Sequence, residues 1–478
     1  MKKSFVILTV FALLLGLIGC GGSDAEAGSS TAQAAPEGFL VGYGRTDITP
    51  YYDPVPLAGY GNTSTRMSNG VGDVLYTTCI AFTDEDGETV LIYHNDLTST
   101  PAGVFDDVKK RICDATGVPE DHIMVSATHT HSAPDLGNTA EPSITRYRTM
   151  LSDWMVEAAV KAMADRRPAT LEVASAQTEN LTFVRHYIVD DGSTVAENYG
   201  VLGTRQYVSH CHDADGQMQL YRFRFADAQD VVLVNWQAHP TRYGKTNNAS
   251  ADFIGPLRTR LENKLDCRMA YFTGAAGNLN PSSRITSEIR TKDNTTLGNM
   301  LADYAVDALK EPREVSLGDV AIVSKTYTGP VDKSEDHLIG VATQLRDLWV
   351  KTNDNNLCLE EAAKLGLGSQ YHANHIISRN AMADTHTITI HALSLGDAAF
   401  IFAPYEMFDQ NGVQIKEGSP FDTTFVVTLA NDGNGYIAAR ECAEHGCYGF
   451  DTRIYPIGTA EILVDEYLSM LEGLYANK

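Results

Sequence analysis

Apolar and polar positions along the chain follow two patterns, one typical of strands and one typical of helices. Residues 75–82 and 89–93 are apolar runs around a turn, which indicates two strands. Residues 101–115 show an amphipathic helical pattern that ends at Gly117, and residues 123–125 indicate a short buried strand. Strand, helix and strand in this order predict a βαβ unit within a mixed sheet.

The same patterns continue to the end of the chain. Residues 143–166 form a predicted helix with Ser143 as its N-cap and Pro168 beyond its end. The further predicted strands are residues 171–174, 219–225, 231–236, 387–395 and 398–402. The further predicted helices are residues 254–265, 335–351, 359–365 and 458–474. We therefore expect one large mixed α/β domain with central sheets flanked by helices, in which the block from about Leu317 to residue 365 caps a cleft.

The first residues resemble an export signal. Lys2 and Lys3 precede an apolar stretch at residues 5–17, which is too short to span a membrane. Leu17-Ile18-Gly19-Cys20 resembles a bacterial lipobox, in which the chain is cut before a cysteine that is then lipidated. The expected divisions are a lipoprotein signal peptide at residues 1–19, a flexible tether at residues 20–37 and the folded domain at residues 38–478. The mature protein would be exported and anchored at the bacterial cell envelope by lipid on Cys20.

Composition and charge narrow the choice of partners. With 43% hydrophobic and 21% charged residues the chain is globular, and its net charge of −24 would repel phosphates. We therefore expect no nucleic acid partner, and no membrane contact except through the lipid anchor. Seven cysteines remain besides Cys20, without a CxxC pair, so they cannot all pair within the chain. Cys442 and Cys447 are close enough in sequence for a disulfide, and the alternative is buried, reduced cysteines.

Histidines follow two of the predicted strands. His129 and His131 come after residues 123–125, and on extended backbone side chains two positions apart point to the same side. Both imidazoles are therefore expected to face one cleft. His239 follows residues 231–236 and repeats the order of apolar strand, small residue, histidine and proline. Imidazoles at strand ends suit a metal ion or a reacting carbonyl, although His129 and His131 alone are equally consistent with surface histidines.

Two other segments have a pattern that suggests a site. A strand from Ala270 runs into the glycine-rich turn Gly274-Ala275-Ala276-Gly277, where bare backbone N–H groups can approach a substrate oxygen, and tight packing is the alternative. Residues 210–216 contain two histidines, a cysteine and two aspartates. We interpret them as a turn and not as a second metal cluster, because Asp-x-Asp-Gly is common turn chemistry.

Five motifs in a fixed order resemble a known family. They are GRTDITP…PLAGYG, ATHTHSAPD, NWQAHPT, ADFIGPLRTRL and GAAGNLNP. They resemble the catalytic domain of the neutral/alkaline non-lysosomal ceramidases, from about Gly42 to the C-terminus. The resemblance implies a zinc-dependent amidase that cleaves the N-acyl bond of ceramide.

The resemblance also implies a ligand set for zinc, which consists of His129, His239, Glu406 and Tyr436. Tyr405 stands where the family has a glycine before the glutamate, and alanines follow Tyr436 where the family has threonines. Two neutral imidazoles and a carboxylate are usual ligands of catalytic zinc, which lowers the pKa of a bound water to about 7. A tyrosine ligand requires a lowered phenol pKa, which the cation can supply.

Four further residues are predicted to be catalytic. His131 would hydrogen-bond the developing oxyanion or pass a proton. Tyr448, twelve residues after Tyr436, would contact the substrate. Arg185 would lie near the substrate carbonyl, with an ordinary surface arginine as the alternative. The family pattern GDxSPN has a serine that contacts the scissile amide, and here Asn280 takes its place, unless Asn280 only ends the turn.

We therefore expect a zinc-dependent hydrolase that cleaves an amide, with the N-acyl bond of ceramide or a related N-acyl lipid favoured and zinc-activated water as the nucleophile. The partner would be a small-molecule or lipid substrate. One alternative is a zinc hydrolase of another amide or an ester. Another is a non-catalytic solute-binding lipoprotein, for which two similar lobes joined by hinge strands would be expected. We expect a single catalytic domain without the C-terminal immunoglobulin-like domain of ceramidases, since the chain stops after the predicted helix at residues 458–474.

Overall fold

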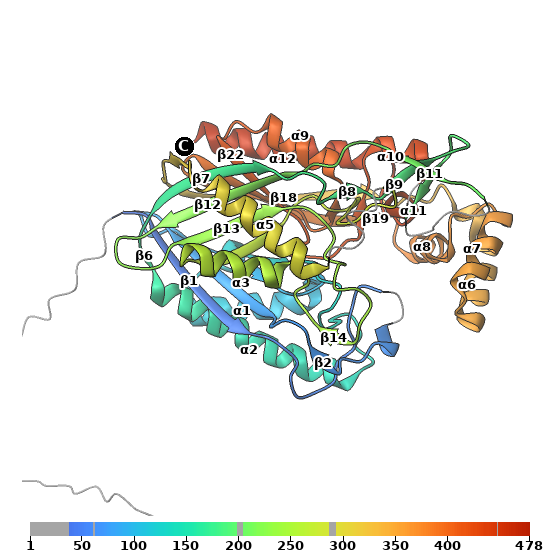
Figure 1. Ribbon diagram of the computed structural model, residues 1–478, viewed down its shortest axis with the longest axis horizontal. Helices are drawn as coiled ribbons and strands as arrows, with labels where there is room; N and C mark the ends of the chain where they lie inside the picture. Colours follow the sequence, from blue (N-terminus) through green and yellow to red (C-terminus); the bar gives the residue numbers. More distant parts are fainter. Residues whose placement is uncertain (1–37, 61–62, 198–203, 286–292, 447) are drawn as a thin grey trace, which may run out of the picture. The chain divides into compact units, whose positions relative to one another are not determined.

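The computed structural model describes residues 38–478 except 61–62, 198–203, 286–292 and 447 (Figure 1). The predicted signal peptide and tether lie outside the described residues. So does Cys447, and its disulfide with Cys442 stays a prediction. Free thiols are present at Cys79, Cys113, Cys267 and Cys358. Within the described part of the chain, no helix combines the length and the apolar character needed to cross a membrane.

Three larger sheets contain most of the described strands. The first has the order β5-β4-β3-β1-β6 and consists of β1 (Leu40–Asp47), β3 (Tyr76–Thr83), β4 (Thr89–Asn95), β5 (Ile123–Ala127) and β6 (Arg167–Pro168). The second has the order β15-β13-β12-β7-β17 and consists of β7 (Thr170–Gln177), β12 (Gln217–Arg224), β13 (Val231–Trp236), β15 (Arg268–Thr273) and β17 (Arg313–Val315). The third has the order β18-β19-β20-β22 and consists of β18 (Val320–Pro330), β19 (Thr385–Leu395), β20 (Ala398–Phe402) and β22 (Thr423–Val427).

Helices cover one face of each sheet (Figure 1). They are α1 (Ala102–Thr116) and α2 (Pro142–Asp165) on the first, α3 (Ile254–Leu265) and α5 (Asn294–Ala308) on the second, and α9 (Asp409–Gly418) and α12 (Thr459–Ala476) on the third. Alternation along the strands decides which side chains meet the helices. In β13, for example, Val232 and Val234 pack under α3 and α5, whereas Val231 and Leu233 point to the opposite face.

The faces turned away from the helices meet in one shared core. Phe82 of the first sheet lies 5.2 Å from Phe223 of the second and 6.5 Å from Phe400 of the third, measured between ring centroids. Strands that are buried on both faces read as continuous apolar runs, which explains the pattern seen in the sequence. Polar side chains can therefore gather at the strand ends.

Each of these sheets contains one parallel pair of neighbouring strands joined through a helix. The βαβ units in the described residues are β4-α1-β5, β13-α3-β15 and β20-α9-β22. Their carboxyl ends hydrogen-bond to one another, since Ala127 N donates to Leu429 O (3.2 Å) and Thr428 N donates to Thr273 O (3.0 Å). Ligands of α/β proteins bind at the carboxyl ends of parallel strands, so a site is expected at this junction.

Shorter elements join and extend these layers. The short strands are β2 (Gly70–Val71), β8 (Phe183–Val184), β9 (His186–Val189), β10 (Thr194–Ala196), β11 (Tyr207–His210), β14 (Asn248–Ala249), β16 (Leu279–Asn280), β21 (Glu406–Met407) and β23 (Tyr436–Ile437). The 3₁₀ helices are η1 (Thr63–Thr65), η2 (Glu120–His122) and η3 (Asp336–Leu338). The remaining helices are α6 (Ile339–Thr352), α7 (Asn355–Lys364), α8 (Gln370–Ala381), α10 (Arg440–His445) and α11 (Tyr448–Asp451). α6, α7 and α8 share a small apolar cluster of their own.

The predicted mixed α/β fold with helices flanking central sheets is confirmed. The bounds predicted at residues 231–236, 254–265 and 398–402 coincide with β13, α3 and β20. The βαβ unit predicted between residues 75 and 125 is also confirmed, because β4 and β5 are parallel.

Some local predictions are wrong. Ser143 is not the N-cap of α2, because Pro142 takes the first helical position, where its missing N–H costs nothing, and Glu141 is the N-cap. The helix predicted from residue 335 begins as η3, and α6 starts only at Ile339. The pattern also fails to predict α5, α8 and α9.

Candidate metal centre

His129 lies beyond the carboxyl end of β5, in a loop. Its φ of 68° is left-handed, a conformation that is uncommon for a residue other than glycine. The loop is held by a hydrogen bond from His129 N to Leu97 O (2.9 Å) and by contact of His129 Nδ1 with Thr98 O (2.7 Å). The expectation of extended backbone is therefore wrong here, although the imidazoles of His129 and His131 do converge, with their Nε2 atoms 3.3 Å apart.

His239 follows β13 and is held by the glycine-rich turn. Its Nδ1 lies 2.8 Å from Ala276 O and 3.1 Å from Leu279 O. A carbonyl oxygen can only accept, so the imidazole proton sits on Nδ1 and Nε2 presents a lone pair. Thr98 O fixes His129 in the same way. The turn thus supplies carbonyls to a histidine, and N–H groups aimed at a substrate stay a prediction.

Glu406 reaches the same place from β21, which follows β20 of the third sheet along the chain. Parallel pairing of β21 with β23 sets Glu406 beside Tyr436. Glu406 Oε2 lies 3.3 Å from His129 Nε2 and 3.1 Å from His239 Nε2. Tyr436 Oη lies 3.3 Å from His239 Nε2. The four residues predicted to bind the metal therefore converge, with His129, His239 and Glu406 each delivered by a different βαβ unit.

The spacing of these atoms fits a tetrahedral metal ion. Ligands at about 2.0–2.1 Å from zinc stand about 3.3 Å apart at the corners of a tetrahedron. The separations here are 3.1 and 3.3 Å. Glu406 Oε2 is buried and has no hydrogen-bond partner among the described residues. Such an oxygen beside two imidazole lone pairs is costly unless a cation or a proton lies between them, so the residues fit a zinc ion.

Burial and charge act together on the pKa values of the site. Burial alone would raise the pKa of Glu406, but the imidazoles of His129 and His239 hold it well below its usual range. Burial and the Arg185 guanidinium lower the pKa of His239 to about 4. Burial would also lower the pKa of His129, but the Glu406 carboxylate raises it. Metal ligation requires an ionised carboxylate and neutral imidazoles.

His131 differs from the other histidines in what holds it. Ring nitrogens of His129, His131 and His239 lie within 4.8 Å of one another, so this group could hold a metal ion through three histidines. However, His131 Nδ1 has no hydrogen-bond partner in the described part of the chain, whereas ligating histidines almost always anchor their second nitrogen. The His131 ring instead meets the Tyr60 ring edge-on, with centroids 5.1 Å apart. The geometry favours His129 and His239 as ligands and His131 as their neighbour.

Known proteins share both the sequence pattern and the fold. Residues 39–277 match the family model described as neutral/alkaline non-lysosomal ceramidase, N-terminal. The chain belongs to this ceramidase family. It is similar in structure to the neutral ceramidase from Pseudomonas aeruginosa, with a TM-score of 0.68 at 18% identity over 92% of this chain and 75% of that chain. A ceramidase complexed with C2 matches with a TM-score of 0.66 at 16% identity over 92% of this chain and 76% of that chain. At these identities the structures establish the fold.

Arg185 of this ceramidase-family protein is buried, so its interpretation as an ordinary surface arginine is wrong. Only 3% of the residue is exposed. Its Nη2 donates to Gly277 O (2.6 Å), and its Nη1 lies 3.5 Å from His239 Nε2. The guanidinium carbon lies 5.2 Å from the ring centroid of Tyr436 and 5.3 Å from that of Tyr448. Arg185 is therefore part of the site, and its contact with a substrate stays a prediction.

Tyr448 begins α11 and adds a second aromatic ring. Its centroid lies 5.5 Å from that of Tyr436 and 5.9 Å from that of Tyr371 in α8. Burial raises the pKa of Tyr448 to about 12, so its hydroxyl keeps the proton and can donate a hydrogen bond. The contact with Tyr371 brings the α6–α8 region to the site, while the capping of a cleft by that region stays a prediction.

Asn280 is the predicted site residue that the structure does not bring to the histidines. Its Nδ2 donates to Glu197 Oε2 (3.0 Å), and Arg284 Nε contacts the other oxygen of that carboxylate (3.1 Å). Among the described residues, no hydrogen bond joins Asn280 to His129, His131 or His239. The geometry thus points to a role in holding β16, and the predicted substrate contact stays untested.

Residues 210–216 form a turn between β11 and β12, as interpreted from the sequence. Their histidines have protein partners. His210 Nε2 lies 2.8 Å from Ser283 Oγ, and His212 Nε2 lies 3.1 Å from Asp409 Oδ1. These contacts satisfy both side chains without a metal ion.

The structure also gives several residues a role near the site that the sequence did not assign to them. Thr98 and Ala276 act through backbone carbonyls, which leave no signal in the sequence. Tyr60, Asn278 and Asp409 have side chains that act near the site. The sequence features that could have pointed to them are the PLAGYG motif for Tyr60, the end of the glycine-rich turn for Asn278 and the position three residues after Glu406 for Asp409.

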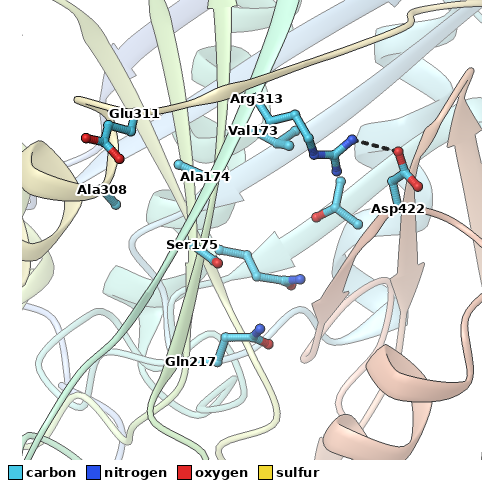
Figure 2. Close-up of a pocket in the computed structure, with 10 residues that line it drawn as sticks. Val173, Ala174, Ser175, Gln217, Ala308, Glu311, Arg313 and Asp422 are labelled. Carbon is cyan, nitrogen blue, oxygen red and sulfur yellow. Dashed lines mark hydrogen bonds and ion pairs between the residues drawn. The ribbon is translucent and has the colours of Figure 1, made fainter.

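A separate hollow of about 340 Å³ lies between the second and third sheets (Figure 2). Ser175 and Gln217 line it from β7 and β12, and the ion pair between Arg313 and Asp422 crosses one side (2.7 Å). None of the predicted site residues lines this hollow, so it is not part of the metal centre.

Proposed function

We propose that the protein is a zinc-dependent hydrolase that cleaves the N-acyl bond of ceramide or of a related N-acyl lipid. The proposal rests on one observation, the convergence of His129 Nε2, His239 Nε2 and Glu406 Oε2 with separations of 3.3 and 3.1 Å from the carboxylate oxygen. Membership of the ceramidase family supports the substrate class.

The donor atoms favour zinc over other ions. Two imidazole nitrogens and a carboxylate are typical of catalytic zinc, whereas magnesium and calcium prefer oxygen ligands alone. When bound, zinc would supply a Lewis acid and lower the pKa of a water molecule at its open position to about 7.

The chain's own residues would bind and orient the substrate around that position. His131 would hydrogen-bond the oxygen that gains charge or pass a proton to the leaving amine. The Tyr448 hydroxyl can donate to the amide carbonyl. The Arg185 guanidinium lies over both tyrosine rings, and the Tyr436 oxygen lies beside His239 Nε2.

The alternatives differ in how well they agree with the structure. A solute-binding lipoprotein should have two similar lobes joined by hinge strands, whereas the three larger sheets of the described residues surround one core. A zinc hydrolase of another amide or an ester would use the same ligands. Asn280, which replaces the family's serine, keeps that alternative open.

The test combines metal analysis with a substrate panel. We expect about one zinc ion per purified chain and hydrolysis of N-acyl sphingosines that is lost after chelation and restored by zinc. An N-acyl sphingosine and an O-acyl ester of the same chain length form a matched pair. Hydrolysis of the ester alone would overturn the substrate, and protein without bound metal would overturn the zinc centre.

We also propose export and lipid anchoring at the bacterial cell envelope. The support is the sequence Lys2-Lys3, the apolar residues 5–17 and the lipobox-like segment that ends at Cys20. Cys20→Ala should abolish incorporation of labelled fatty acid, whereas Cys113→Ala is the matched control and should keep it. Label retained in Cys20→Ala would contradict the anchor.

A further inference from the structure

A buried amide–carboxylate pair joins parts of the site that come from different sheets. Asn278 Nδ2 donates to Asp409 Oδ1 (2.6 Å), and Asp409 N donates to Asn278 Oδ1 (2.9 Å). Asn278 is fully buried and Asp409 is 2% exposed. A reciprocal pair of hydrogen bonds that includes a charge and excludes water is strong and geometrically specific.

Asn278 belongs to the turn that holds His239 and Arg185. Its backbone oxygen accepts from Arg185 N (2.9 Å), and Gly277 O accepts from Arg185 Nη2 (2.6 Å). Ala276 O contacts His239 Nδ1 (2.8 Å). A shift of this turn would therefore move both side chains.

Asp409 belongs to the segment that begins with Glu406. Gly277 N donates to Met407 O (2.7 Å), and a Cβ atom at Gly277 would lie 2.7 Å from Glu406 O, so the turn and the segment touch through their backbones. Phe408, between Glu406 and Asp409, packs against the ring of Tyr436 with centroids 6.5 Å apart. Because Met407, Phe408 and Asp409 are all buried, we expect a displacement of Asp409 to move Glu406 as well.

Asp409 already has a full set of protein donors. His212 Nε2 (3.1 Å) and Gln410 N (2.9 Å) contact Oδ1, and Asp215 N donates to Oδ2 (3.2 Å). Asp409 is also the first residue of α9, where a negative charge is favourable. Its carboxylate therefore needs no metal ion, and its effect on the site must be indirect.

We propose that Asn278 and Asp409 are positioning residues that hold the glycine-rich turn against the segment following β20. Through this contact, His239 and Glu406 keep the spacing that metal binding requires. The inference rests on the proposed function. Partners behind the ligands of a metal site typically change metal affinity or activity by about 10–100-fold when they are altered.

Exchanging the two partners provides the test. Asn278→Asp alone sets two buried carboxylates side by side, and we expect Co²⁺ affinity and kcat to fall about 10–100-fold with KM changed less than about threefold. Asp409→Asn alone leaves a neutral pair and should cost about tenfold. The double variant restores one amide and one carboxylate, and should return both quantities to within about threefold of the wild type.

Co²⁺ serves as the probe because its visible absorption spectrum reports ligand geometry without any turnover. The spectrum should change in Asn278→Asp and return in the double variant. Asp96→Asn is a matched control, because Asp96 is a buried carboxylate that also lies beside a histidine. It should lower the thermal midpoint and leave the Co²⁺ spectrum unchanged.

Several outcomes would reject the positioning role. Co²⁺ affinity equal to wild type in Asp409→Asn, or a double variant that recovers its thermal midpoint without recovering Co²⁺ affinity and kcat, would each do so. If Asn278→Asp does not fold, Asp409→Asn and the double variant decide the question. Wild-type protein that binds Co²⁺ but hydrolyses no N-acyl substrate would overturn the proposed function, and the Co²⁺ affinities would still test this inference.

Discussion

Two buried sites in this protein, each with a carboxylate beside histidine, differ in how the charge of the carboxylate is balanced. At the end of β4, His94 Nε2 lies 3.1 Å from Arg258 Nη2 and 3.4 Å from Asp96 Oδ1, and His94 Nδ1 contacts the backbone of Tyr271. Arg258 also contacts Asp96 directly (2.7 Å). The protein itself therefore supplies the positive charge that this buried carboxylate requires.

At the candidate metal centre, no arginine or lysine among the described residues forms an ion pair with Glu406. His129 and His239 anchor their Nδ1 atoms to carbonyls and turn their Nε2 atoms toward Glu406. Arg185 lies beside them, but its Nη2 donates to Gly277 O and its Nη1 lies 3.5 Å from His239 Nε2. The comparison shows that burial of histidines and carboxylates does not indicate a metal site by itself. The informative feature is a buried carboxylate whose close partners in the described part of the chain are the Nε2 atoms of two histidines.

The largest expected effect is that of Glu406→Gln, which removes the charge that attracts the cation. Bound zinc and turnover should both be lost, with turnover lowered about 10³-fold or more, because the metal supplies several kcal/mol of transition-state stabilisation. Metal analysis and turnover on the same preparation check this. Asp96→Asn is the matched substitution at the other buried carboxylate, which lies beside His94 and Arg258. This variant should keep the zinc. A Glu406→Gln protein with full metal content would show that the ion is held by other residues.

His131→Ala should show whether His131 binds the metal ion or only lies beside the ligands His129 and His239. Zinc should remain, and turnover should fall about 10²–10⁴-fold through loss of a hydrogen-bond donor or proton carrier. His239→Ala, its matched variant, should lose the metal. If His131→Ala lost zinc as well, the three-histidine group would be the correct ligand set.

Arg258→Met should have the opposite effect to Glu406→Gln, because it should lower stability and leave the metal centre intact. It leaves Asp96 buried without its partner, and breaking a buried ion pair costs about 3–5 kcal/mol of folding free energy. Urea unfolding measures that loss. Turnover per folded molecule and zinc content should stay at wild-type values, and a loss of zinc in this variant would mean that the two sites are coupled.

The smallest expected effect is that of Asn280→Leu. It removes a donor from Glu197 and should cost about 1–3 kcal/mol of stability if that carboxylate stays buried. Asn280→Ser should be tolerated and is the matched control. Thermal midpoints and turnover on one preparation separate the roles: lowered turnover with an unchanged midpoint would restore Asn280 as a substrate contact.

The sequence predicted elements whose buried faces are apolar. β13 is buried on both faces and begins with four consecutive apolar residues, and α3 has a clear apolar stripe. α8 was not predicted because it buries polar residues such as His372 and Arg379, which are satisfied by ion pairs to Glu335. α9 contains Gly412, where a Cβ atom would lie 2.5 Å from that of Ala275, so a residue chosen for close packing weakened the helical pattern.

For the site, local pattern identified His129 and His239 but not their geometry. The left-handed backbone of His129 depends on hydrogen bonds to Leu97 and Thr98, which a local pattern does not reveal. Glu406 and Tyr436 were assigned only through the family resemblance. They meet through parallel pairing of β21 and β23 across thirty residues of chain, a contact that no periodicity predicts.

The distribution of ligands over three βαβ units has a consequence for biosynthesis. The candidate ligand His129 follows a strand of the first βαβ unit, whereas Tyr436 lies beyond the last βαβ unit along the chain. A ribosome-bound chain that has emerged only in part cannot complete the coordination sphere. First-row transition metals compete for such sites mainly through their availability. If the proposed zinc centre is correct, the compartment in which the last βαβ unit folds would decide which ion the protein acquires.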